Sequence, residues 1–280
     1  MTPSPQSYRP DRHSGGVAGA SDRLDAQIRL TWPSERRILR DTERTPPDTI
    51  VELGCGTGSL LAEMRTEWPD ANLIGVDNDA ELISRATHLR DVALLRADVN
   101  SVPLPDASAD LVVLRYVLQH LGETGPALAE ALRILKPGGR CVVFEVDGEL
   151  WGLAEPYIPE VQRLQARIWA AQADRGGNRM IGRRVRRMCL EAGFAEAELE
   201  LYQYSSEAFG LDAFGPLLDP AQHVDLVEDG VISPGELARA SVAYSQWLRD
   251  PGNFVMMVGF AVTAIRRSDD WPMIGIGPLE

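Results

Sequence analysis

The segment IVELGCGTG, residues 50–58, places three glycines within five positions after a short apolar run. The run at 49–53 is typical of a buried strand, and the amphipathic stretch that follows is typical of a helix. Gly54, Gly56 and Gly58 therefore form a G-x-G-x-G pattern in a strand–helix turn. Without side chains there, a ligand can lie against the backbone and near the free N–H groups of the helix.

The same strand–helix rhythm continues to about residue 147. Strands are predicted at 49–53, 72–77, 92–98, 111–117 and 140–147, and helices at 57–68, 79–89 and 123–135. The KPGG segment at 136–139 predicts a helix stop and a turn, because proline cannot continue a helix and glycine tolerates positive φ. This alternation favours an α/β fold with a Rossmann-like, doubly wound parallel sheet.

The flanking regions are mostly helical. Pro33 predicts two short helices within 22–41, and further elements are a helical stretch at 155–192, a strand at 195–205, helices and loops at 205–250, and a last apolar strand at 254–267. We divide the chain into a flexible arm at 1–20, a domain at 21–267 and a tail at 268–280. The domain has a core at 45–150 and a helical cover at about 151–192 and 205–252.

Composition narrows the functional classes. The 280 residues carry a net charge of −13, which weighs against binding to a nucleic-acid backbone. Four arginines within 183–187 most simply form a solvated helix face. The three cysteines are widely spaced, so they predict neither a disulfide framework nor a zinc site, and we expect no metal. We expect the thiols to be buried and reduced, which suits a cytoplasmic protein. Neither a signal-peptide h-region nor a membrane-spanning apolar run is visible.

Acidic residues end two later strands of the predicted sheet. Asp77 ends the second strand and Asp98 ends the third. Parallel strands end at a common edge, which is where open α/β sheets bind ligands. The Asp77 carboxylate can accept hydrogen bonds from the vicinal hydroxyls of a ribose. It could instead cap a helix, although Asp79 is better placed for capping.

Four segments in this order, VELGCGTG, GVDND, RADV and LRILKPGGRCVVFEV, resemble the motifs of class I S-adenosylmethionine-dependent methyltransferases. The resemblance covers residues 49 to about 147. It implies a seven-stranded sheet with an antiparallel last strand, a position that the strand at 254–267 suits. It also implies S-adenosyl-L-methionine as cofactor and S-adenosyl-L-homocysteine as product.

The resemblance further implies which residues bind the cofactor. The methionine part would lie against Glu52, Gly54, Gly56 and Gly58, the ribose against Asp77, and the adenine against Asn78, Asp98 and Val99, while Arg115 would touch the methionine end through its backbone. Tyr8 lies in the N-terminal arm, which folds over the cofactor in similar enzymes; exposure of this tyrosine without a role is the alternative.

Other nucleotide-binding functions fit less well. Nicotinamide dehydrogenases usually carry G-x-G-x-x-G, with the third glycine one position later than Gly58, and their Tyr-x-x-x-Lys pair is missing here. The Asn/Asp-Pro-Pro-Tyr segment usual in methyltransferases of adenine or glutamine amides is replaced by LRYVLQHL. A protein or nucleic-acid methyltransferase and a cofactor-binding protein without methyl transfer stay as alternatives.

Methyl transfer depends mainly on orientation and exclusion of water, so a catalytic residue need not be obvious. His120 is placed to act as a base near neutral pH, if the nucleophile must lose a proton. It could equally pack or contact the cofactor, because the Q-H-L stretch forms part of the cofactor wall in similar enzymes. Glu145 and Asp147 lie at the carboxyl end of the fifth predicted strand and either face the substrate or serve in salt bridges and caps.

The acceptor is expected to be a small molecule. The insertion at 205–252 is rich in apolar and aromatic residues, namely Phe209, Phe214, Leu217, Leu218, Tyr244 and Trp247. With Trp151, Tyr157 and Trp169 it predicts a helical lid over an apolar pocket, which suits an aromatic or natural-product-like acceptor and an enzyme of secondary metabolism. Packing in a subunit interface is the alternative. We expect no nucleic-acid or membrane partner, and a homodimer is a candidate assembly.

Overall fold

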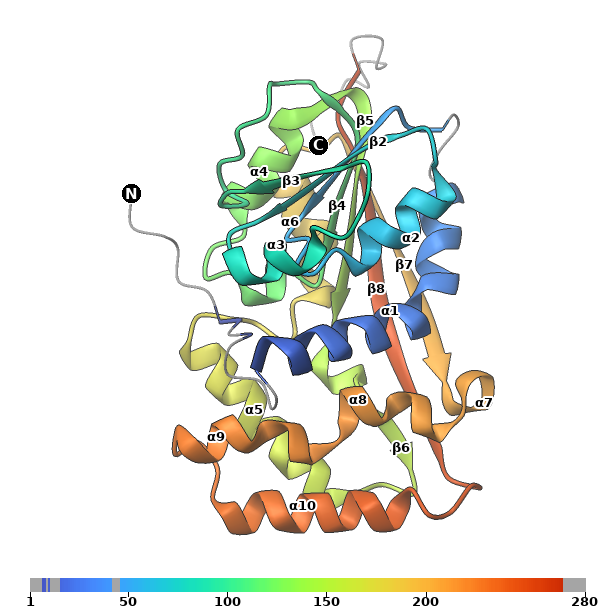
Figure 1. The fold of residues 1–280 in the computed structure, drawn as a ribbon, viewed down its shortest axis with the longest axis vertical. Coiled ribbons are helices and arrows are strands. Elements are labelled where there is room, and N and C mark those ends of the chain that lie inside the picture. Colours follow the sequence, from blue (N-terminus) through green and yellow to red (C-terminus); the bar gives the residue numbers. More distant parts are fainter. Residues whose placement is uncertain (1–6, 9, 11–15, 42–45, 269–280) are drawn as a thin grey trace, which may run out of the picture.

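A single mixed sheet forms the centre of the molecule (Figure 1). The computed structural model describes residues 7–8, 10, 16–41 and 46–268. In these residues the strands are β1 (Thr49–Leu53), β2 (Asn72–Asp77), β3 (Val92–Arg96), β4 (Ala109–Arg115), β5 (Leu135–Val146), β6 (Leu153–Glu155), β7 (Glu196–Ser205) and β8 (Phe254–Ile265). Their order is β3-β2-β1-β4-β5-β8-β6, and β7 also pairs with β8.

The strand directions match the predicted fold. Strands β1 to β5 are parallel, and β8 runs antiparallel to β5, β6 and β7. The prediction of a doubly wound sheet with an antiparallel last strand is therefore confirmed. The short strand β6 is an addition, because it pairs with the part of β8 that extends beyond β5.

The helices are α1 (Gly16–Asp41), α2 (Ser59–Glu67), α3 (Ala80–Ala86), α4 (Gly125–Ile134), α5 (Pro159–Asp174), α6 (Val185–Glu191), α7 (Ser206–Phe209), α8 (Gly215–Leu218), α9 (Val224–Glu228) and α10 (Pro234–Trp247). Asp79 caps α3 as expected, since its carboxylate accepts from the N–H groups of Glu81 and Leu82.

Two local predictions were wrong. Residues 22–41 do not form two short helices, because α1 continues through Pro33. Figure 1 shows instead that α1 changes direction along its length, as a helix with an internal proline does. The helix ends before the KPGG segment as predicted, and Gly138 has a positive φ, but the segment is part of β5 rather than a turn before it. A Cβ at Gly139 would lie 2.9 Å from the Lys136 carbonyl oxygen and 3.0 Å from that of Asp110, so the glycine permits this close approach.

Alternating residues of the central strands supply two separate cores. On one face, Ile50, Val113 and Phe144 belong to a cluster with residues of α1 and α2. On the other face, Val51 and Leu114 belong to a cluster with residues of α4 and α6. Burial on both faces is what the near-continuous apolar strands predicted.

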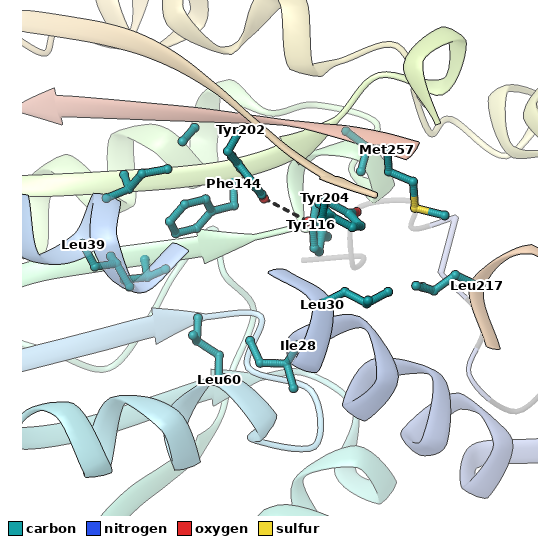
Figure 2. Close-up of a cluster of buried hydrophobic side chains, with 14 of the residues drawn as sticks. Ile28, Leu30, Leu39, Leu60, Tyr116, Phe144, Tyr202, Tyr204, Leu217 and Met257 are labelled. Atoms are coloured by element: carbon teal, nitrogen blue, oxygen red, sulfur yellow. Dashed lines mark hydrogen bonds between the residues drawn. The ribbon is translucent and has the colours of Figure 1, made fainter. Parts of the chain in front are cut away.

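The first cluster extends from the sheet to α1 and the C-terminal helices (Figure 2). Figure 2 shows Ile28 of α1 facing Leu60 of α2, and Leu30 of α1 facing Leu217 of α8. The hydroxyls of Tyr116 and Tyr202 lie 3.0 Å apart within this cluster. Helix α1 is thereby packed across the sheet edge where the predicted site lies.

Helices α5 and α8 to α10 gather at one end of the sheet (Figure 1). Phe214, Leu217, Leu218, Tyr244 and Trp247 of this region are buried, whereas Phe209 and Tyr157 are exposed. The predicted division into a core at 45–150 and a cover stays a prediction, and residues 269–280 of the predicted tail lie outside the described residues. Among the helices that the structure describes, none is both long and apolar enough to cross a membrane.

Candidate functional site

A first cavity of about 1050 Å³, mouth included, lies at the carboxyl ends of the parallel strands. It brings together most of the sequence-predicted site residues, namely Tyr8, Glu52, Gly54, Gly56, Asp77, Asn78, Val99, Arg115 and His120. Gly58 and Asp98 are not among the residues that line it. Sequence reasoning missed Arg23, Leu24 and Gln27 of α1 and Arg179, which also line this cavity.

The glycine turn leaves no room for a side chain at its first position. Gly54, Gly56 and Gly58 all have positive φ, between 54° and 79°. A Cβ at Gly54 would lie 2.4 Å from Cγ2 of Val117, which also lines the cavity. The backbone N–H groups of Gly54 and Cys55 donate to the Val76 carbonyl and so tie the turn to β2.

Asp77 links the glycine turn to the start of α3. One carboxylate oxygen accepts from the Gly56 N–H at 2.8 Å and the other from the Asp79 N–H at 2.9 Å. Burial raises the pKa of Asp77, while these two backbone donors act in the opposite direction. Each oxygen keeps acceptor capacity, so the carboxylate can still bind hydroxyl groups of a ligand in the cavity.

Glu52 presents an unsatisfied carboxylate oxygen to the same cavity. The residue is only 3% exposed, and its Oε2 has no hydrogen-bond partner in the described part of the chain. Burial raises the pKa of Glu52 well above its usual value, and the charge of Arg115 opposes this shift. A buried acceptor without a donor is unfavourable unless a ligand supplies one. The site is therefore suited to a ligand with an ammonium or other N–H group.

The Arg115 side chain binds residues of α1. Its guanidinium donates to Glu35 of α1 at 2.9 Å and to Thr31 at 2.8 Å, in a buried ion pair. The Tyr202 hydroxyl donates to the same Glu35 carboxylate. Arg115 thus links α1 to the end of β4, and its predicted backbone contact with the cofactor stays a prediction.

Tyr8 and His120 lie together at the cavity wall. Their ring centroids are 5.0 Å apart, and Ser7 Oγ lies 3.1 Å from Nδ1 of His120. The Ser7 N–H also donates to the His120 carbonyl oxygen. Burial raises the pKa of Tyr8. The described part of the N-terminal arm therefore packs on the site, whereas the roles of both residues stay predictions.

Asp98 adjoins the cavity without lining it. Its carboxylate accepts from the Asn100 N–H at 2.9 Å, in a turn that places the neighbouring Val99 at the cavity wall. Its predicted contact with an adenine stays a prediction.

Asp147 serves in a cap and an ion pair, since it accepts from the Glu149 N–H and from Arg183 at 2.7 Å. Glu145 is fully buried and accepts from the Gln119 N–H.

A second cavity of about 980 Å³, mouth included, adjoins the first. Tyr8, Arg23, His120 and Arg179 line both cavities. Apart from Ser7, the remaining wall of the second cavity comes from the helical cover and includes Trp151, Trp169, Arg175, Leu217 and His223. Of the residues from which the lid was predicted, Trp151, Trp169 and Leu217 line this cavity, and the lid itself stays a prediction. The wall also carries charged groups that sequence reasoning did not foresee.

Comparison with known proteins matches residues 51–143 to a family model described as a methyltransferase domain. An uncharacterised 37.1 kDa protein from a Streptomyces fradiae transposon is 36% identical over 168 residues, which cover 58% of this chain and 48% of that protein. Trans-aconitate 2-methyltransferase of Azoarcus sp. is 39% identical over 121 residues, or 41% of this chain and 47% of that protein. The chain spans about half the length of these curated relatives.

Solved structures agree with the fold. A SAM-dependent methyltransferase of Thermotoga maritima superimposes with a TM-score of 0.54 at 18% identity, covering 87% of this chain and 92% of that one. At this identity the likeness concerns the arrangement of strands and helices. The glycine turn, Asp77 and the unsatisfied Glu52 lie in the part of the chain that the family model matches.

Proposed function

We infer that this chain, which belongs to the class I S-adenosylmethionine-dependent methyltransferases, transfers a methyl group from S-adenosyl-L-methionine to a small organic molecule. The first cavity is the proposed cofactor site. The observation that carries this assignment is the buried, unsatisfied Glu52 carboxylate beside a glycine turn with positive φ. A ligand with an ammonium group can donate to the Glu52 carboxylate, and the same ligand can lie against the backbone of the glycine turn.

The residues of the first cavity fit this cofactor. Glu52 would accept from the ammonium of its methionine part, because the buried carboxylate lacks a donor of its own. Asp77 would accept from the ribose hydroxyls with the lone pairs that its backbone donors leave free. Bound there, the cofactor supplies a methyl group already activated on a sulfonium. The protein then has to orient the acceptor and exclude water.

The second cavity is the proposed acceptor site. It shares Tyr8, Arg23, His120 and Arg179 with the first cavity, so an acceptor in it lies next to the cofactor. Aromatic side chains in its wall favour an aromatic or natural-product-like acceptor. His120, at this junction, is the proposed base for acceptors that must lose a proton.

The direct test is turnover with S-adenosyl-L-methionine carrying a labelled methyl group and a panel of small aromatic acceptors. The proposal predicts transfer of label and formation of S-adenosyl-L-homocysteine. Binding of S-adenosyl-L-homocysteine without turnover on any acceptor would favour the cofactor-binding alternative. Label found only on a protein or nucleic acid would favour the macromolecular alternative.

His120 has a separate test on the same assay. If the imidazole is the base, exchange of His120 for Gln should lower kcat by about 10²–10⁴-fold with acceptors that lose a proton. It should also flatten the pH profile of kcat near neutrality. An unchanged kcat would assign His120 to the cavity wall only. The proposal also includes a cytoplasmic location, which cell fractionation tests. It further includes a homodimeric state, which light scattering tests.

A further inference from the structure

The second cavity gathers positive charge where it meets the first. Arg23 and Arg179 line both cavities, and His223 lines the second. Burial lowers the pKa of His223 to about 4, and the charges of the two arginines act in the same direction. All three side chains line the second cavity, and the imidazole is neutral near pH 7. The positive charge at the junction comes from the two arginines.

Among the residues that the structure describes, Arg179 has no carboxylate partner. Its guanidinium donates to Oε1 of Gln119 at 2.6 Å and lies over the Trp151 ring at 4.8 Å, and within the described residues it forms no ion pair. Burial lowers the pKa of Arg179 to about 10, with Arg23 acting in the same direction and Glu145 against it. A desolvated cation that faces another cation is unfavourable until an anion joins them. This arrangement is therefore prepared for a negatively charged ligand.

The neighbouring donors are also unused. Nε of Arg23 and Nε of Arg175 are buried, and neither has a hydrogen-bond partner in the part of the chain described. Two acidic residues, Asp225 and Asp229, line the same cavity, but each already has an interaction of its own. Guanidinium groups bind carboxylates through paired N–H donors in one plane, which a single ammonium cannot do.

We propose that the methyl acceptor carries a carboxylate, which binds to Arg179 and Arg23 at the junction of the two cavities. The apolar part of the acceptor then lies against Trp151, Trp169 and Leu217 of the helical cover. The carboxylate anchors the molecule and so orients its reacting atom toward the first cavity. This proposal rests on the proposed function and names the chemistry of the acceptor for the same site.

The test compares two probes of nearly equal shape, indole-3-acetate and indole-3-acetamide, which differ in charge. Each is titrated into the full chain saturated with S-adenosyl-L-homocysteine. The carboxylate should bind at least about tenfold more tightly than the amide, because only the carboxylate accepts charge-assisted hydrogen bonds from the guanidinium groups. No preference for the carboxylate in the wild-type protein would overturn the proposal, and this comparison needs no variant.

Variants assign the preference to one residue. Arg179→Gln should lower it strongly because only Arg23 is left to bind the carboxylate, and Arg179→Lys should restore part of it because a positive charge returns without the planar fork. Arg163→Gln on α5 is the matched control, since this arginine is exposed and pairs with Glu160. The Arg163→Gln variant should prefer the carboxylate probe over the amide probe as strongly as the wild-type protein does.

The affinity for S-adenosyl-L-homocysteine separates the two proposals. If Arg179→Gln weakens this affinity strongly and keeps the carboxylate preference, Arg179 belongs to the cofactor site and the carboxylate proposal is wrong. If the wild-type protein does not bind S-adenosyl-L-homocysteine at all, the proposed function fails. Normal binding of S-adenosyl-L-homocysteine without a carboxylate preference refutes only the acceptor chemistry.

Discussion

Replacement of Gly54 by Ala tests whether the first turn is built for close approach. Gly54 has a φ of 79°, a conformation that costs an L-residue about 1–2 kcal/mol. The new Cβ would also meet Cγ2 of Val117 at 2.4 Å, and such overpacking typically costs about 1–3 kcal/mol. The variant should therefore lose about 2–5 kcal/mol of unfolding free energy. Displaced Val117 should also weaken binding of S-adenosyl-L-homocysteine, because it lines the same cavity.

Gly230→Ala is the matched control. Gly230 has a φ of 71°, but nothing lies within 4 Å of the position of its Cβ. This variant should lose only the backbone contribution, about 1–2 kcal/mol, and keep the wild-type affinity for S-adenosyl-L-homocysteine. Urea unfolding of both variants measures the difference. If Gly54→Ala is no more destabilised than Gly230→Ala, the argument from crowding is wrong.

Three further predictions concern buried carboxylates. Asp77→Asn should weaken S-adenosyl-L-homocysteine binding by about 1–3 kcal/mol in calorimetry, because an amide offers one acceptor oxygen where the backbone uses two. Burial raises the pKa of Glu145 to about 8, so in this range the folded chain holds a proton that the unfolded chain releases. The free energy of unfolding should therefore decrease as the pH rises from about 4.5 to about 8. Glu145→Gln should show a flatter unfolding profile across that range, and equal slopes would contradict the assignment. Glu35→Ala should cost about 3–5 kcal/mol because it leaves Arg115 buried and unpaired, whereas Arg37→Ala on the exposed side of the same helix should cost less than about 1 kcal/mol in the same measurement.

Local sequence patterns were sufficient to predict the glycine turn and Asp77 of the first cavity. The glycine turn and Asp77 belong to short strand–turn units whose periodicity and spacing determine where the strands end. Parallel strands then bring these ends to one edge without further information. Seven of the strands could be predicted from such patterns, whereas the antiparallel direction of β8 was implied only by the family resemblance.

Contacts between distant segments could not be predicted. Arg23 lies in α1 and Arg179 lies between α5 and α6, so their meeting at the junction depends on how α1 and the helical cover pack. Similarly, Arg115 pairs with Glu35 across 80 positions of the chain. In the sequence, each of these residues is a charged side chain in an apolar or helical segment. Exposure to solvent explains such a charge equally well. The three-residue β6 was also too short to carry a pattern.

Calorimetric titration with S-adenosyl-L-homocysteine tests the central claim most directly. The assignment of the first cavity predicts one molecule bound per chain, with lower affinity in both Gly54→Ala and Asp77→Asn and unchanged affinity in Gly230→Ala. Absence of binding to the wild-type protein, or equal affinity in all four proteins, would contradict the claim that this cavity holds the methyl donor.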